Sequence, residues 1–257
     1  MIIELFGHQG AGKTTFAHAL SASLRDRGHV VRLFLSYRPA EPPPPVHPCA
    51  GDAIRPQAAA VARRLIRPAV EMLALACRPV ANSHDIREAA ALIRILPPKS
   101  MFWSLRMGQY IVRLSHAWRQ ASQADHIVLF DQAYVQAVYS LALVGRAADE
   151  TVLARALNVT PKSDLLIRLD APRDVLKARL YERHRLQGAI ERLFELDLKR
   201  NLESIQIIDR LHDMLRRSGQ PVTCASSLDQ RSLRESVEKI EQQLLVKFPT
   251  QRTGMVS

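Results

Sequence analysis

The 257-residue sequence has little cysteine. Cys49, Cys77 and Cys224 are odd in number, lie far apart and show no C-x-x-C spacing. Disulfide frameworks use an even number of cysteines and zinc sites use closely spaced ones, so this pattern predicts neither. A chain without structural disulfides fits a reducing compartment, so we expect the protein to be cytoplasmic.

Long apolar runs are also missing. The best candidate, residues 58–77, is interrupted by Arg63, Arg64, Arg67 and Pro68, so it falls short of the roughly 18 apolar residues that a membrane span needs. The first six residues have no basic region ahead of an apolar one, so they predict a strand and not a signal peptide. We expect no membrane partner.

Acidic residues are in a minority. The chain has 25 Asp and Glu against 36 Lys and Arg, which gives a formal net charge of +11 and a pI of about 10.1. A basic excess favours anionic partners, but the arginines are dispersed over expected helices and form no basic stripe. No aromatic and basic stacking motif is present, so nucleic acid is not an expected partner, whereas a homodimer stays open.

The apolar pattern predicts an alternation of strands and helices. A strand at 2–6, a glycine-rich turn, a helix at 13–27 and a strand at 29–35 make one βαβ unit, and further strands are expected at 126–130, 165–169 and 222–225. Alternating strands and helices predict an α/β fold with a five-stranded, doubly wound parallel sheet and helices on both faces. Ligands of such sheets bind beyond the carboxyl ends of the strands.

A helical insertion separates the second and third strands. The proline-rich segment 39–56 predicts an exposed loop, and helices are expected at 57–77, 84–96 and 99–121, so that the loop and insertion span 40–122. Later helices are expected at 134–144, 150–157, 172–185, 189–217 and 228–246. We predict a single domain over 1–247 and a flexible tail at 248–257.

The segment from Gly7 to Thr15 carries the most specific motif. Gly7, His8, Gln9, Gly10, Ala11, Gly12, Lys13 and Thr14 satisfy G-x-x-x-x-G-K-[ST], and Thr15 follows. In this motif backbone N–H groups surround the phosphates at a helix N-terminus, the lysine reaches the β and γ phosphates, and the hydroxyl ligates Mg²⁺. We predict a P-loop NTPase fold with ATP, or else GTP, and Mg²⁺ as cofactors.

Two further elements supply charge at the same edge of the sheet. Asp131 ends the third strand, where a carboxylate can hold Mg²⁺ or accept a proton, and the alternative role is a helix N-cap. Arg179 and Arg183 share one helix face and Arg185 follows, so that 179–192 predicts a lid-like segment that neutralises a transferring phosphoryl group. The alternative for these arginines is a solvated helix face.

Together these motifs resemble the thymidylate kinase and nucleoside/nucleotide kinase group. The resemblance rests on residues 7–15, on Asp131 followed by Tyr134, and on the stretch 163–172 ahead of Arg179 and Arg183. It implies that Arg179, Arg183 and Arg185 form an arginine-bearing lid, that Ser226 lies in an adenine-contacting loop, and that Arg106 contacts the acceptor. The alternative for Arg106 is a surface arginine beside the core residues Phe102 and Trp103.

The sequence departs from that group on the acceptor side. Gln9 stands where the group carries a carboxylate, Arg38 lies where Arg-Glu-Pro is usual, and Gln132 replaces an arginine. The predicted acceptor contacts are therefore Arg38, Arg106, Gln132 and Tyr134, and the predicted acceptor is not thymidylate.

We expect an ATP-dependent phosphotransferase that moves the γ-phosphoryl group of ATP·Mg²⁺ to a small-molecule acceptor such as a nucleoside or nucleotide. The expected catalytic residues are Lys13, Asp131, Arg179, Arg183 and Arg185, with Thr14 and Asp131 as metal ligands. A GTP switch is disfavoured because Asp131-Gln-Ala-Tyr replaces D-x-x-G. A non-kinase P-loop ATPase or a regulatory ATP-binding protein stays open as the alternative.

Overall fold

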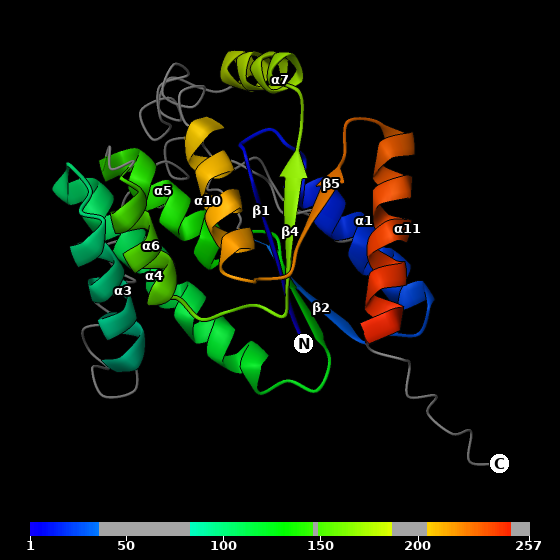
Figure 1. The fold of residues 1–257 in the computed structure, drawn as a ribbon, viewed down its shortest axis with the longest axis horizontal. Coiled ribbons are helices and arrows are strands. Elements are labelled where there is room, and N and C mark those ends of the chain that lie inside the picture. The colour runs from blue at the N-terminus through cyan, green and yellow to red at the C-terminus, as the bar shows by residue number, and fades with distance from the viewer. Residues whose placement is uncertain (36–82, 146–148, 187–204, 248–257) are drawn as a thin grey trace, which may run out of the picture.

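The structure is a computed structural model that describes residues 1–35, 83–145, 149–186 and 205–247 (Figure 1). Several predictions lie outside these ranges: the proline-rich loop, the helix at 57–77, Arg38, residues 187–192 of the lid-like segment and the tail at 248–257. The predicted helix at 189–217 is described only for its second half.

Five parallel strands form one sheet, as the sequence predicts. The strands are β1 (Ile2–Gly7), β2 (Val31–Phe34), β3 (Ile127–Phe130), β4 (Leu165–Asp170) and β5 (Val222–Ser226), in the order β2-β3-β1-β4-β5. All six residues of the central β1 are buried, because a parallel strand covered by helices on both faces buries both of its rows of side chains. The predicted α/β class and the five-stranded parallel sheet are confirmed.

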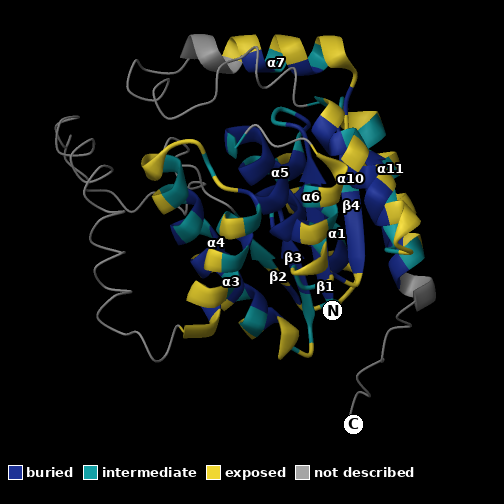
Figure 2. Ribbon diagram, turned by 60° about the vertical axis from the view of Figure 1, so that its left-hand side comes forward, coloured by how far each residue is buried: buried dark blue, intermediate teal, exposed yellow. Residues whose placement is uncertain are grey.

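Helices cover both faces of the sheet (Figure 1). One face carries α4 (Met101–Ser122), α5 (Tyr134–Gly145) and α10 (Ile205–Arg217), against which α3 (Ser83–Ile95) and α6 (Glu150–Asn158) pack. The other face carries α1 (Lys13–Asp26) and α11 (Gln230–Lys247). Strands and inner helix faces are buried while α3 and α11 expose their outer faces (Figure 2).

The described part of the insertion consists of α3 and α4, which pack against each other, while α4 also packs onto α5 and α3 onto α6. Trp118 of α4 stacks on Phe130 of β3 with ring centroids 5.4 Å apart, and it meets Tyr134 edge to face at 5.2 Å. Aromatic pairs at such distances add to the apolar burial that holds the layers together. The insertion helices are therefore joined to the sheet through a shared core.

The remaining helix, α7 (Arg173–Leu186), follows β4 and lies beyond the carboxyl edge of the sheet (Figure 1). At this edge end β1 at Gly7, β3 ahead of Asp131 and β5 at Ser226. The topology thus gathers the phosphate loop, Asp131 and the segment after β5 at one edge of the sheet. Within the described ranges, no helix is both long and apolar enough to cross a bilayer.

Candidate nucleotide site

The phosphate loop joins β1 to α1 through glycines with positive φ. Gly10 has φ 81° and Gly12, the N-cap of α1, has φ 87°, a left-handed conformation that costs little only for glycine. A Cβ on Gly12 would also overlap the hydroxyl of Ser227, so space as well as φ requires glycine there. The loop therefore presents successive backbone N–H groups at a helix N-terminus, the arrangement that binds phosphate.

Lys13 lies inside the loop. Its buried ammonium group donates to the carbonyl oxygens of Gly7 at 2.8 Å and His8 at 2.7 Å. The neighbouring carbonyls are bonded from outside the loop: Arg179 donates to Gly10 O at 2.9 Å, and the Ser227 hydroxyl donates to Ala11 O at 2.9 Å. The carbonyl oxygens of the loop are thus satisfied by cations and a hydroxyl, which suits a site for an anion.

A cavity of about 490 Å³ opens over the loop, a volume typical of small-molecule sites. Its walls come from the phosphate loop, the end of β3, helix α7 and the loop and first turn after β5. The lining residues are Gln9, Gly10, Gly12, Lys13, Thr14, Thr15, Gln132, Arg179, Ser227, Leu228, Asp229, Gln230 and Leu233.

Thr14 and Asp131 bring two oxygen ligands together beside the cavity. The Thr14 hydroxyl donates to Asp131 Oδ2 at 3.2 Å, and Asp131 is 1% exposed. The Asp131 amide donates to the Phe34 carbonyl at 3.1 Å, which fixes the carboxylate at the end of β3. A hydroxyl and a carboxylate are the hard ligands that Mg²⁺ prefers, so the pair fits this ion in the presence of phosphates.

Glu4 takes the helix-capping role that was the alternative for Asp131. Its carboxylate, buried in β1, accepts a hydrogen bond of 2.6 Å from the Val135 amide in the first turn of α5. Burial raises the pKa of Glu4 to about 8, although the backbone hydrogen bond acts in the opposite direction. Asp131 in turn accepts a hydrogen bond from Thr14.

His8 and Gln9 occupy variable positions of the motif. Burial, assisted by the charge of Lys13, lowers the pKa of His8 to about 4, so its imidazole is neutral at neutral pH. It meets Tyr139 edge to face at 6.3 Å. Gln9 and Lys13 both line the cavity, so the phosphate loop contributes an uncharged amide as well as a cation to the lining.

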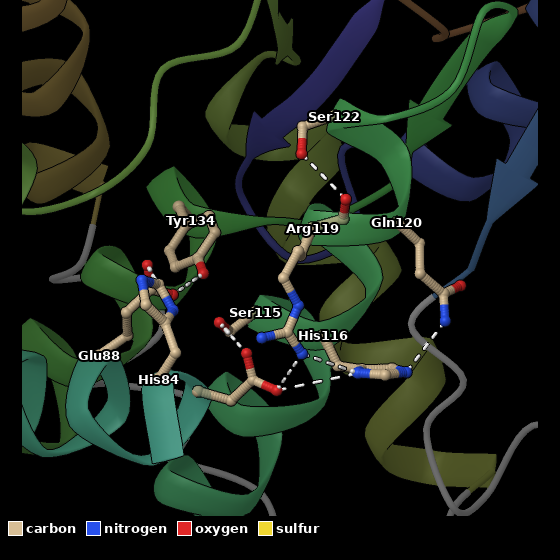
Figure 3. Close-up of polar contacts among 9 residues, drawn as sticks. His84, Glu88, Ser115, His116, Arg119, Gln120, Ser122 and Tyr134 are labelled. Carbon is tan, nitrogen blue, oxygen red and sulfur yellow. Dashed lines mark hydrogen bonds and ion pairs between the residues drawn. The ribbon is translucent and has the colours of Figure 1, made fainter. Parts of the chain in front are cut away.

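The predicted acceptor residues divide into two groups. Gln132 lines the cavity beside Thr14. Tyr134 is buried under α4 and donates from its hydroxyl to Glu88 Oε2 at 2.6 Å (Figure 3), while the Arg106 guanidinium lies 5.3 Å from the centre of the Trp103 ring. Neither Tyr134 nor Arg106 is among the residues that line the cavity.

The lid arginines are described only in part. Arg179 lines the cavity, and Arg183 and Arg185 follow on the same helix, α7, with side chains outside the described structure. The predicted Ser226 is not among the residues that line the cavity, and its buried hydroxyl has no hydrogen-bond partner. The next residue, Ser227, lines the cavity and donates to the phosphate loop.

The sequence prediction missed the residues after Ser226. Ser227, Leu228, Asp229, Gln230 and Leu233 all line the cavity. Asp229 and Ser232 cap α11 reciprocally: Ser232 N donates to Asp229 Oδ1 at 2.7 Å and Asp229 N donates to Ser232 Oγ at 3.1 Å. These hydrogen bonds hold the pKa of Asp229 below its ordinary value. An Asp-x-x-Ser pattern in the first residues of the helix expected at 228–246 is the signal that would have located this turn.

The fold and the loop define the class of protein: an α/β fold of the P-loop NTPase type, with sheet order 2-3-1-4-5 and a phosphate loop between β1 and α1. No protein-family model matches the sequence, and no curated protein matches it.

Among solved structures the chain is similar to deoxyadenosine kinase from M. mycoides. With bound dATP, that enzyme is 12% identical over 95% of this chain and 99% of its own, at a TM-score of 0.49. With dCMP and a flexible dCDP bound, the identity is 13% over 96% of this chain and 100% of the enzyme, at a TM-score of 0.48. With dCTP bound, the identity is 14% over 96% of this chain and 100% of the enzyme, at a TM-score of 0.46. A likeness at this level carries no argument about activity, and the class rests on the chain's own sheet order and loop.

Proposed function

We propose that the protein is an ATP-dependent phosphotransferase that moves the γ-phosphoryl group of ATP·Mg²⁺ to a small-molecule acceptor, with nucleosides and nucleotides as the first candidates. The observation that carries the proposal is the 3.2 Å contact between Thr14 and Asp131 beside a cavity floored by a complete phosphate loop. This arrangement places a cation, two metal ligands and backbone N–H groups around one anion site.

Each residue has a distinct role in the proposal. Lys13 lies at the loop and would shift from the carbonyls of Gly7 and His8 to the β and γ phosphates, where its charge offsets that of the transferring group. Thr14 and Asp131 would hold Mg²⁺, which bridges phosphate oxygens and neutralises their charge. In the alternative role that the sequence leaves open, Asp131 would accept a proton from the attacking hydroxyl.

The acceptor would lie beside Gln9 and Gln132. Gln9 lines the cavity from the phosphate loop and Gln132 lines it from the end of β3, and each amide can donate and accept hydrogen bonds. The predicted lid residues Arg183 and Arg185 would close over the transferring phosphoryl group from α7. In-line transfer then depends on how closely these elements hold the two substrates together.

A phosphoryl-transfer assay tests the proposal. Purified protein would be incubated with γ-labelled ATP, Mg²⁺ and a panel of nucleosides, nucleoside monophosphates and sugars, and labelled products would be separated. We expect transfer to one acceptor class, reduced about 100-fold or more in Lys13→Ala and Asp131→Asn. Asp125→Asn, at a fully exposed carboxylate ahead of β3, is the matched control and should transfer at the wild-type rate.

Two results would contradict the proposal. Transfer that persists in Lys13→Ala would place the chemistry elsewhere. ATP hydrolysis that no acceptor changes would favour a P-loop ATPase or a regulatory ATP-binding protein.

A further inference from the structure

Arg179 is bonded to two separate segments of the chain. Its guanidinium donates from Nη1 to Gly10 O at 2.9 Å and from Nη2 to Leu228 O at 3.0 Å and Ser227 O at 3.3 Å. Gly10 belongs to the phosphate loop, and the two other acceptors follow β5. The side chain therefore bridges opposite walls of the cavity from its position on α7.

Ser227 makes a second connection between the same two walls. Its buried hydroxyl donates to Ala11 O at 2.9 Å across 216 residues of sequence. The contact is close-packed, because a Cβ on Gly12 would overlap this hydroxyl. Two consecutive carbonyls of the phosphate loop, at Gly10 and Ala11, are thus each held by a donor from outside the loop.

These two carbonyls control where the loop's N–H groups point. In a planar trans peptide the carbonyl and the next residue's N–H point in opposite directions. Holding Gly10 O and Ala11 O outward therefore turns the N–H groups of Ala11 and Gly12 toward the inside of the loop, where Ala11 N donates to His8 O at 3.3 Å, a long hydrogen bond that a phosphate oxygen would replace. The flanking glycines would otherwise let these peptides rotate at little cost.

We propose that Arg179 and Ser227 are positioning residues that clamp the phosphate loop to the segment after β5 and so preset its N–H groups for the phosphates of a nucleotide. The proposal rests on the proposed function only in that a nucleotide occupies the cavity. It differs from the lid role, in which Arg179 would act on the transferring phosphoryl group. Three carbonyl acceptors already engage the guanidinium, so its effect reaches the nucleotide through the loop.

A double-mutant cycle separates the two roles. Affinities for ATP·Mg²⁺ and ADP·Mg²⁺ would be measured by calorimetry for wild type, Arg179→Met, Ser227→Ala and the double variant. We expect Arg179→Met to weaken ATP and ADP equally, roughly tenfold, and Ser227→Ala roughly threefold, because both nucleotides use the same loop amides. The double variant should lose less than the product of the single losses, since both residues hold one loop.

Two more variants serve as controls for the cycle. Arg179→Lys keeps the charge but cannot reach three carbonyls, so it should behave like Arg179→Met. Lys177→Met, at an exposed cation on the same helix, is the control and should bind like wild type. Recovery of function in Arg179→Lys, an effect on kcat with unchanged ADP affinity, or fully additive losses would each overturn the clamp.

A nucleotide-free measurement keeps the clamp distinguishable from the proposed function. Hydrogen exchange at the amides of residues 10–14 should be at least severalfold faster in Arg179→Met than in wild type or Lys177→Met, with denaturation curves confirming that each variant is folded. Unchanged exchange would overturn the clamp even if ATP binds. If exchange were faster in Arg179→Met but the protein bound no nucleotide, Arg179 would still be shown to hold the loop. Its role in nucleotide affinity and the proposed function would both be overturned.

Discussion

The phosphate-loop region and the α3–α4–α5 layer use buried polar groups in different ways. Around the loop, the side chains of Lys13, Arg179 and Ser227 bond to backbone carbonyls beside a cavity. In the helical layer, polar side chains bond to one another: the fully buried Asp85 accepts from Ser115 at 2.7 Å and from Arg119 at 2.9 Å (Figure 3).

The difference lies in whether the polar group, once bonded, helps to form a surface that a ligand can reach. In the helical layer, a side chain whose partners are other side chains is satisfied within the core and holds helices together. A side chain that holds backbone beside a cavity shapes a surface that a ligand can meet. Tyr134 illustrates the distinction, because its hydroxyl donates to Glu88 within the helical layer and it lies away from the lining of the cavity.

The largest expected effect is at the end of β1. A Cβ on Gly7 would overlap the backbone carbonyl of Leu169 in the neighbouring β4, and φ is 146°. We expect Gly7→Ala to lower the free energy of unfolding by about 4 kcal/mol, measured by urea denaturation, because two paired strands must separate. Gly28→Ala, with φ 87° and no atom within 4 Å, should cost only about 1 kcal/mol. If the two variants lost similar unfolding free energy, the strands would have to accommodate a Cβ at Gly7 without separating, which contradicts this prediction.

A smaller loss is expected in the helical layer, and it should leave the site intact. Asp85→Ala removes the acceptor of Ser115 and Arg119, and we expect it to lower the free energy of unfolding by about 3 kcal/mol. Affinity for ATP·Mg²⁺, measured below the unfolding transition, should stay at the wild-type value. Asp125→Ala, at an exposed carboxylate, is the control for stability. A fall in nucleotide affinity would show that the helical layer and the phosphate-loop region are coupled, which contradicts the distinction between them.

Glu4 lies between the regions and predicts a pH dependence. Its pKa is raised from 4.5 to about 8 mainly by burial, so the folded state holds a proton that the unfolded state releases in this window. Stability should therefore fall as pH rises from 4.5 toward 8, and Glu4→Gln should remove most of this fall in denaturation curves taken across the window. Glu238→Gln, exposed on α11, should follow the wild-type curve. A Glu4→Gln curve parallel to wild type would contradict this account.

The smallest effect tests the role of Tyr134. Tyr134→Phe leaves the Glu88 carboxylate without one donor and should cost about 1 kcal/mol of unfolding free energy. Because the hydroxyl does not line the cavity, the KM for the acceptor should not change. An increase in that KM without a loss of stability would instead support the acceptor contact that the sequence predicts.

The fold and the phosphate loop could be predicted because their signals are local. Each strand is a short apolar run, and the loop's residues are contiguous, so periodicity and a single motif locate them. Observed strand ends lie within two residues of those expected.

The rest of the site depends on contacts between distant residues. Glu4 reaches Val135 across 131 residues and Ser227 reaches Ala11 across 216 residues, distances over which one sequence carries no local pattern. Ser226 and Ser227 show the limit most clearly. Ser226 is paired with Asp170 in the sheet, and successive side chains of a strand point to opposite sides, so the strand's register decides that Ser227 meets the phosphate loop.

Binding of ATP·Mg²⁺ to the wild type and to Lys13→Ala tests the central claim most directly. Calorimetry should show one site in the wild type, and at least about tenfold weaker binding both in Lys13→Ala and in wild type when EDTA removes the metal. Unchanged denaturation curves would confirm that the variant is folded. If Lys13→Ala bound ATP·Mg²⁺ as tightly as the wild type, the assignment of residues 7–15 as the nucleotide site would be wrong.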